Sequence, residues 1–233
     1  MPALHILSGG AAYGLVMSVK PRFQAMTGLD IDGDFGAVGI MAGKLRGGTP
    51  ADIAILTAAL IADLAREHLV VADSVTDIGL VETALAVRAG DPPVAAPDAS
   101  ALREAFLAAG AIFVPDTIAS TAGIHVAGML AKLGITDAVA DRLKIFPNGA
   151  TAMRNLAASN AARPLGCTQA TEIIATEGVT LSASLPKGYE LATVYTAAVT
   201  AQAGNAEQAK ILIGLLAGAA QRELRIRAGF LDV

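Results

Sequence analysis

The stretch "STAGIHVAGML", residues 120–130, places two hydroxyls, a glycine and a histidine at the predicted start of a helix. Backbone N–H groups in a first helical turn lack intrahelical partners and carry the positive end of the helix dipole. Ser120 and Thr121 would add hydroxyl groups at the same place. This combination is typical of an anion-binding helix end, although the two hydroxyls could also serve only to cap their own helix.

His125 lies one helical turn after Thr121 and shares its stripe of the helix. Because helical side chains lean toward the N-terminus, the imidazole is expected over Thr121 and Ala122, where an anion would sit. Such an imidazole can bind a carboxylate or transfer a proton near neutral pH. The alternative is a partly buried histidine that donates a hydrogen bond to a carbonyl.

Two other strand-to-helix turns carry small or hydroxylic residues. "LSGGAA" contains Ser8 and Gly9, and "DFGAVG" contains Ala37 and Val38. In a parallel α/β sheet such turns gather at the carboxyl edge of the strands. The recurrence of three such turns predicts one shared pocket that binds the negative charge of a ligand.

Four polar side chains are further candidates for this pocket. Tyr13 follows the first glycine turn and Tyr195 lies in "ATVYTAAV", although a half-buried tyrosine with a satisfied hydroxyl is the commoner case. Thr168 and Gln169 are predicted at the beginning of a helix after "PLGC", where they would add donors. Cys167 has no basic neighbour to activate its thiol, which favours a small, inert apolar side chain.

Composition and missing motifs exclude several classes of protein. A net charge of -4 with 17 Lys plus Arg gives no broad basic face, so we expect no nucleic acid partner. No phosphate-binding glycine loop, G-x-S-x-G motif or metal-spaced His or Cys pair is present, so we expect neither a cofactor nor a metal. "ILIGLLAGAA" is too short to span a bilayer, which predicts no membrane insertion.

The N-terminal residues indicate in which compartment the protein is expected. "MPALHILSGGAAYG" has no basic region before its apolar run, and it is typical of a strand and turn rather than a signal peptide. The sequence as given therefore predicts a cytoplasmic protein. A longer native N-terminus could restore an export signal and would predict a periplasmic one.

Short apolar runs alternate with segments of helical period. The chain opens with strands at 4–7, 29–35 and 51–56, each followed by a helix, which is the order of a parallel sheet covered on both faces. Pro21 should bend the first helix and Gly28 should end it. Further on, Asp98 should cap a helix, and Asn205 with Gln208 should cap a last long helix over 206–224.

Several segments together resemble the molybdate-type periplasmic solute-binding proteins. They are "LHILSGGAAYGLVMSVKPRFQAMTG", "GGTPADIAIL", "PDTIASTAGIHVAGMLAKLGI" and the closing "AEQAKILIGLL", and the likeness spans nearly the whole chain. The family implies an α/β, type II periplasmic-binding fold of two lobes with a ligand cleft between them. Carried over, lobe 1 is 1–82 plus 193–233 and lobe 2 is 83–192.

This resemblance also implies roles for particular residues. Ser8 is similar in position to the family's first anion-binding hydroxyl, Ala122 to a backbone donor, and Tyr195 to a tyrosine near the second lobe crossing. Val38 stands where the family's oxyanion binders usually have a serine. One donor hydroxyl is therefore lost, which counts against molybdate or tungstate as the ligand.

"STAGIHV" is also similar to aconitate isomerase and its relatives, which share this fold and shift a carbon–carbon double bond. With no export signal in the sequence, this likeness predicts a cofactor-independent isomerase acting on a small unsaturated polycarboxylate. His125 would be the base, with Tyr13, Tyr195 or Ser8 as partners. The alternative is a solute-binding protein for a small carboxylate or oxyanion, which would serve an ABC permease if exported.

Overall fold

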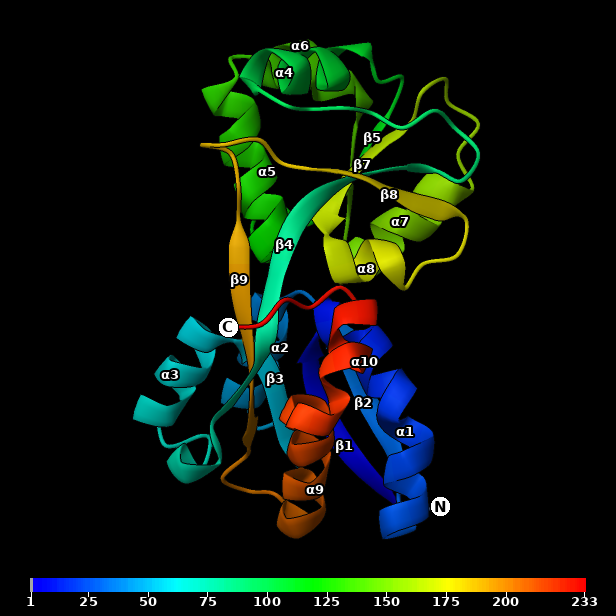
Figure 1. Cartoon of the computed structure of the whole chain (residues 1–233). Helices are drawn as coiled ribbons and strands as arrows, with labels where there is room; N and C mark the ends of the chain where they lie inside the picture. Colours follow the sequence, from blue (N-terminus) through cyan, green and yellow to red (C-terminus); the bar gives the residue numbers. More distant parts are fainter. Residues whose placement is uncertain (1) are drawn as a thin grey trace. The chain divides into compact units, whose positions relative to one another are not determined.

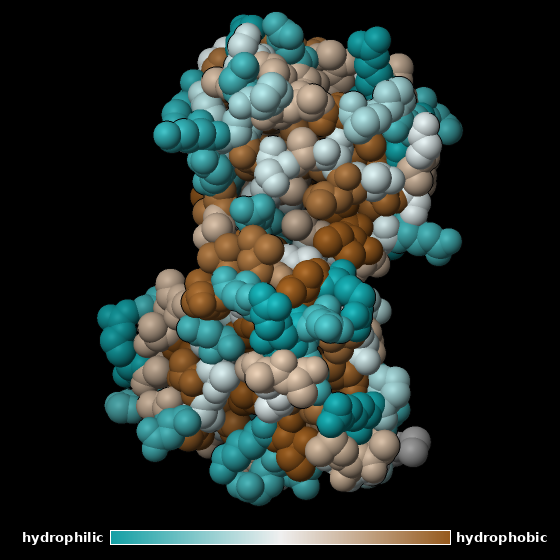
Figure 2. All heavy atoms as spheres, in the orientation of Figure 1, coloured by the Kyte–Doolittle hydropathy of each residue, from teal (hydrophilic) through white to brown (hydrophobic). Residues whose placement is uncertain are grey.

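The computed structural model describes residues 2–233, which divide into two compact units. Unit 1 comprises Met1–Val81 and Thr193–Val233, and unit 2 comprises Glu82–Ala192. The chain passes into unit 2 within strand β4 (Thr76–Arg88) and returns at the start of β9 (Ala192–Val199) (Figure 1). Figure 2 shows hydrophilic side chains spread over the visible face of each unit, with smaller apolar patches between them.

The sheet of unit 1 runs in the order β2 (Asp30–Gly36), β1 (Ala3–Gly9), β3 (Ile53–Thr57) and β9. Strand β1 pairs parallel with β2 and β3, as the alternation of strands and helices predicted. Strand β9 pairs antiparallel with β3, so the sheet is mixed rather than all parallel.

Helices cover both faces of this sheet. Right-handed crossovers place α1 (Tyr13–Thr27) and α2 (Val38–Arg46) on opposite faces. Helices α9 (Ala206–Ala217) and α10 (Arg222–Arg227) contact α1, whereas α3 (Ala58–Arg66) contacts α2. Helix α1 runs unbroken through Pro21 and ends, as predicted, at Gly28, whose φ of 72° suits glycine.

The sheet of unit 2 runs in the order β4, β7 (Leu165–Gln169), β5 (Ile112–Pro115) and β6 (Leu143–Phe146), and β8 (Val179–Ser184) pairs with β4. Strand β5 is parallel to β6 and β7, whereas β4 is antiparallel to β7 and β8.

Alternate residues of β5 enter two separate apolar cores. Ile112 and Val114 pack with α4 (Ala99–Ala108) and α5 (Thr121–Lys132), whereas Phe113 packs with α7 (Gly149–Ala157) and α8 (Ala170–Ile174). A short helix, α6 (Thr136–Val139), completes the first core. This two-residue period explains why an almost wholly apolar run forms a central strand.

Three expectations about elements were wrong. Thr168 and Gln169 belong to strand β7, and the helix that follows covers only Ala170–Ile174. The last long helix stops at Ala217, and α10 follows after a break at Gly218. Asn205 does precede α9, but its side chain does not cap the helix, because its amide donates to Asp52.

Asp52 is the polar centre that joins three segments of unit 1. Its buried carboxylate accepts hydrogen bonds from the backbone N–H of His5 at 2.9 Å and of Asn205 at 2.8 Å, and from the Asn205 amide at 3.2 Å. It therefore fixes the start of α9 against strand β1. The start of α9 is therefore held by Asp52, the residue before β3, rather than by a capping side chain of its own.

We expect Asp52→Ala to lower the free energy of unfolding by about 2–4 kcal/mol, because it leaves buried donors without an acceptor. Urea denaturation followed by circular dichroism measures this change. Asp63→Ala on α3, where the side chain is partly exposed, is the matched control and should shift the free energy of unfolding by less than about 1 kcal/mol. Equal effects of the two substitutions would contradict the role given to Asp52.

Candidate functional site

The strand ends of unit 1 bring three of the predicted residues to one edge of the sheet. In the parallel register Gly9 lies opposite Gly36, so the turns after β1 and β2 begin side by side. Tyr195 of β9 lies opposite Thr57, the last residue of β3. Gly9, Val38 and Tyr195 therefore meet at what we call the unit 1 edge, defined by the ends of β1, β2 and β3.

The side chains of Val38 and Tyr195 come very close to the backbone at Gly9. A Cβ added there would lie 2.7 Å from Cγ1 of Val38 and 2.8 Å from Cε1 of Tyr195, both shorter than any real contact. No side chain caps the helical turn after Gly9, nor α2, whose N-cap residue is Ala37. The first N–H groups of these helices therefore depend on partners other than a capping side chain.

Two other residues predicted for this edge have different surroundings. Ser8 is completely buried, and its hydroxyl donates to the carbonyl of Gly9 at 2.9 Å. Tyr13 is 44% exposed and packs edge-on against Phe35, with ring centroids 5.2 Å apart. Tyr195 is buried and packs edge-on against Phe230.

The start of α5 forms the corresponding edge of unit 2. Its N-cap residue is Ser120, whose side chain makes no capping hydrogen bond, and the helix begins at Thr121 with Ala122 buried behind it. The hydroxyls of Ser120 and Thr121 are therefore not consumed by capping, which was the alternative considered from the sequence. The first N–H groups of α5 have no side-chain acceptor.

The loop before α5 is shaped by Asp116 and Gly123. The Asp116 carboxylate accepts the N–H groups of Ile118 and Ala119 at 2.7 and 2.8 Å, and these backbone hydrogen bonds lower its pKa. Gly123 lets α5 lie against this loop, because a Cβ there would be 2.1 Å from the Asp116 carbonyl oxygen. The glycine in "STAGIHV" thus sets the position of the helix start.

His125 is half-buried and makes the contact that the sequence left as an alternative. Its Nε2 lies 2.8 Å from the carbonyl oxygen of Tyr189. Because a carbonyl only accepts hydrogen bonds, Nε2 carries the proton and Nδ1 is the nitrogen left to act as a base. The following turns of α5 are tied to the same loop, since Lys132 donates to the carbonyl of Gly188 at 2.7 Å.

The end of β7 reaches the same edge of unit 2, because β7 and β5 are parallel neighbours. Here Thr168 is fully buried and donates to the carboxylate of Glu172 at 2.6 Å, so its hydroxyl is held inside the unit. Both polar atoms of the Gln169 amide are buried and bond to no other described residue. A buried amide in this state normally finds a partner in water or ligand.

Glu172 is a functional group that the sequence reasoning missed. It is buried, and that burial raises the pKa of its carboxyl, opposed by hydrogen bonds from Thr168 and from the backbone N–H groups of Ala150, Gln169 and Gly149. Gly149 opens α7, and a Cβ there would lie 1.8 Å from Glu172 Oε2. The start of α7 therefore holds an internal acid. A glutamate within the apolar run "ATEIIA" was the available signal.

We also searched residues 2–233 for a metal site, a reactive cysteine and a membrane-spanning helix. No group of three or more His, Cys, Asp or Glu among residues 2–233 could hold a metal ion. Burial raises the pKa of the Cys167 thiol to about 12, so it stays protonated and unreactive at neutral pH. In the same range no single helix is long and apolar enough to cross a membrane, and only a pair bent by 118° (Thr121–Lys132 with Thr136–Arg142) meets both criteria.

The fold and these helix starts define a class of α/β protein that binds solutes. The family described as bacterial extracellular solute-binding proteins matches residues 4–231, and the chain belongs to this family. The extracellular character of the family does not support the cytoplasmic location expected from the first residues; a periplasmic one is consistent with it.

Solved structures share the fold at low identity. The periplasmic molybdate-binding protein of Azotobacter vinelandii superposes with a TM-score of 0.82 at 16% identity, covering 99% of both chains. The sulfate-binding protein of Mycobacterium tuberculosis superposes with a TM-score of 0.76 at 19% identity, covering 100% of this chain and 88% of the other. These likenesses confirm the type II periplasmic-binding fold.

A curated relative has a different activity. Aconitate isomerase of a Pseudomonas species is 25% identical over 225 residues, which cover 92% of this chain and 82% of that protein. Both likenesses expected from the sequence, to molybdate-type binding proteins and to aconitate isomerase, are therefore present.

We expect Glu172→Gln to change how stability depends on pH. Because the pKa of Glu172 is raised in the folded state, the folded protein holds this proton more tightly than the unfolded chain. The resulting stabilisation is complete below the unfolded pKa of about 4.3 and is lost as pH rises to the folded pKa. The free energy of unfolding of the native protein, relative to the variant, should fall over that window.

Urea denaturation of both proteins from about pH 4 to 8 measures this difference. The exposed Glu177→Gln in the same segment is the matched control. A native-to-Glu172→Gln difference that stays constant with pH would rule out titration of Glu172 in this window.

Proposed function

We propose that this protein binds a small anion, an oxyanion or a carboxylate, as the solute-binding component of an ABC importer. The observation that carries the proposal is the set of uncapped helix starts, at Gly9 and Ala37 in unit 1 and at Ser120 in unit 2. Among the other long helices, α3, α4 and α7 are each capped by a side chain, whereas α9 also lacks a side-chain cap. Family membership supports the same function.

Binding would rest on backbone dipoles rather than on side-chain charges. None of the residues predicted for the site is a lysine or an arginine, and the chain as a whole carries a net charge of -4. Each helix start contributes roughly half a positive charge, together with N–H groups that point at the ligand. Several such starts can hold one or two negative charges without a cationic side chain.

The ligand class follows from the donors present. Relatives in fold are named for molybdate and sulfate, both compact dianions. Val38, the first residue of α2, provides no hydroxyl, whereas Gln169 adds an amide that has no hydrogen-bond partner among residues 2–233. An amide that both donates and accepts suits a carboxylate at least as well as a tetrahedral oxyanion. Molybdate, sulfate and the two aconitate isomers are therefore the first ligands to compare.

Titration calorimetry with molybdate, sulfate, cis-aconitate and trans-aconitate tests the proposal. We expect saturable binding of at least one of them, and weaker binding after Gly9→Ala by about tenfold or more, because the added Cβ displaces Val38 and Tyr195. Gly43→Ala in α2 is the matched control, since its Cβ meets nothing within 4 Å. Absence of binding to all four anions would count against this ligand class.

A second pair of variants separates backbone donors from the hydroxyl in unit 2. Thr121→Pro removes the first N–H of α5 at a position where proline is tolerated, and Ser120 already has the extended conformation that proline requires. Thr121→Val removes only the hydroxyl. Weaker binding for the proline variant alone supports the backbone N–H as donor, and equal loss for both assigns the contact to the hydroxyl.

A second function is favoured by the likeness to aconitate isomerase. In this alternative His125 would move a proton of a bound unsaturated polycarboxylate through Nδ1, while its Nε2 remains bonded to the Tyr189 carbonyl. That carbonyl would fix the tautomer and the ring orientation. Tyr13, Tyr195 and Ser8 stay proposals as partners. The helix starts would stabilise the charge that builds as the proton leaves.

NMR of cis- or trans-aconitate in deuterated buffer tests the isomerase activity. If the protein is an isomerase, solvent deuterium should enter the substrate and the isomers should interconvert. His125→Ala should then lower turnover by about 10²–10⁴-fold, the usual contribution of a general base, while affinity changes little. Unchanged turnover in His125→Ala would remove this residue from the mechanism, and tight binding without exchange would favour the carrier.

A further inference from the structure

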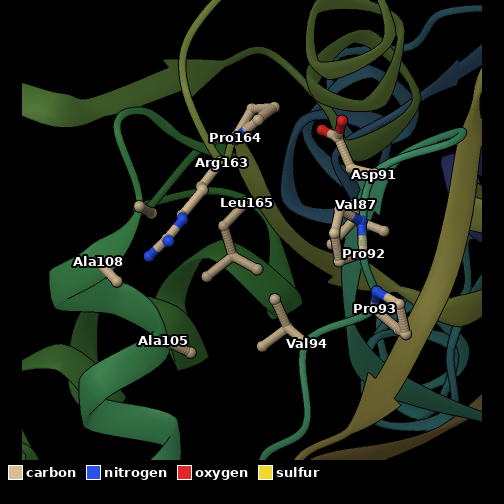
Figure 3. Close-up of a pocket in the computed structure, with 11 residues that line it drawn as sticks. Val87, Asp91, Pro92, Pro93, Val94, Ala105, Ala108, Arg163, Pro164 and Leu165 are labelled. Atoms are coloured by element: carbon tan, nitrogen blue, oxygen red, sulfur yellow. The ribbon is translucent and has the colours of Figure 1, made fainter.

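A cavity of about 350 Å³ lies within unit 2, lined by residues between 87 and 165. Its walls come from the end of β4, the proline-rich loop that follows, the second half of α4 and the start of β7 (Figure 3). Leu165 at the cavity and Gln169 at the start of α8 are opposite ends of β7, which spans roughly 13 Å. The cavity is therefore distinct from the edge of unit 2 described above.

The cavity walls are apolar and of a size that suits a small organic molecule. Val87, Val94, Ala105 and Leu165 are among the lining residues, and none of their side chains contains a polar atom. Ligand sites in proteins commonly have volumes of about 300–1,000 Å³ and apolar walls with a few charged or polar groups. A short hydrocarbon chain would bury its surface against these walls.

One cation at the cavity has no partner. Arg163 is exposed and makes no hydrogen bond or ion pair with any residue in the described part of the chain. Its φ of 49° is a left-handed conformation that glycine adopts freely and arginine adopts only with strain. Figure 3 shows Arg163 and Asp91 on opposite sides of the cavity, with Leu165 and Val94 between them.

Asp91 does not neutralise the positive charge of Arg163, because its carboxylate is already paired with Arg88. Arg88 donates to Oδ1 of Asp91 at 2.9 Å. The other oxygen, Oδ2, is buried and has no hydrogen-bond partner among residues 2–233. This oxygen is an acceptor and offers no donor, so this wall cannot satisfy a second carboxylate on a ligand, which disfavours dicarboxylates and tricarboxylates.

We propose that this cavity binds a small apolar monocarboxylate. Its carboxylate pairs with the guanidinium of Arg163, and its hydrocarbon end packs against Val94 and Leu165. The paired Asp91 wall selects against a ligand with a second anionic end. This site is independent of the anion-binding function proposed above and prefers a different class of acid.

NMR titration of the ¹⁵N-labelled full chain with 4-methylpentanoate tests the proposal. We expect saturable shifts of the amides of Val87, Val94 and Leu165, with little change at the start of α5. Two probes isolate the charges: 4-methylpentan-1-ol has the same apolar body without the carboxylate, and adipate has a second carboxylate. Both should bind at least fivefold more weakly.

Variants of Arg163 separate binding from folding. Arg163→Gly removes the cation and relieves the left-handed backbone, so we expect at least tenfold weaker binding of 4-methylpentanoate with no loss of thermal stability. Arg163→Lys should retain part of the affinity because the charge remains. Arg154→Ala, which removes an exposed arginine on α7, is the matched control and should bind normally.

Any one of the following results would overturn the proposal. They are the absence of shifts at the cavity up to the solubility limit of 4-methylpentanoate, equal binding of the alcohol and the carboxylate, and unchanged affinity in Arg163→Gly. Shifts confined to the start of α5 would also overturn it, because they would assign the probe to the other site. Loss of molybdate, sulfate or aconitate binding would not bear on this cavity.

Discussion

The structure depends on one constraint, which is that parallel strands deliver the turns that follow them to a single edge of a sheet. In unit 1 the register of β1 and β2 places Gly9 opposite Gly36, so two helices begin next to each other. No side chain caps their first N–H groups. Negative charge is the partner that such an arrangement accepts best, and the small residues around it leave the backbone accessible.

Close backbone approach is the second requirement, and glycine meets it in both units. Gly9 admits Val38 and Tyr195, Gly123 admits the carbonyl of Asp116, and Gly149 admits the carboxylate of Glu172. Each glycine stands at or next to the start of a helix. Binding by backbone groups therefore requires small residues at defined positions more than it requires charged side chains, which explains why a chain poor in lysine and arginine can present several donors.

Much of the fold could be predicted from the sequence, and the failures share a physical cause. Local signals identified the strands of unit 1, the end of α1 at Gly28 and the cap of α4 at Asp98, because each depends on neighbouring residues. Asn205 looked like a local cap, yet its amide bonds to Asp52, more than 150 residues earlier in the chain. Glu172 and Gln169 owe their environments to burial by distant elements, which no local pattern reports. The likenesses to molybdate-type binding proteins and to aconitate isomerase were visible in short motifs, because those motifs include the residues at the helix starts.

The carboxyl of Glu172 has a consequence for how much anion the protein can accept. This acid lies against the start of α7, where a Cβ on Gly149 would be 1.8 Å from Oε2 of Glu172, and the same helix start is capped by Asn148. That start is therefore occupied by the chain's own side chains, whereas the starts at Gly9, Ala37 and Ser120 have no capping side chain. The helix starts available to a ligand are thus those that the chain's own side chains leave uncapped.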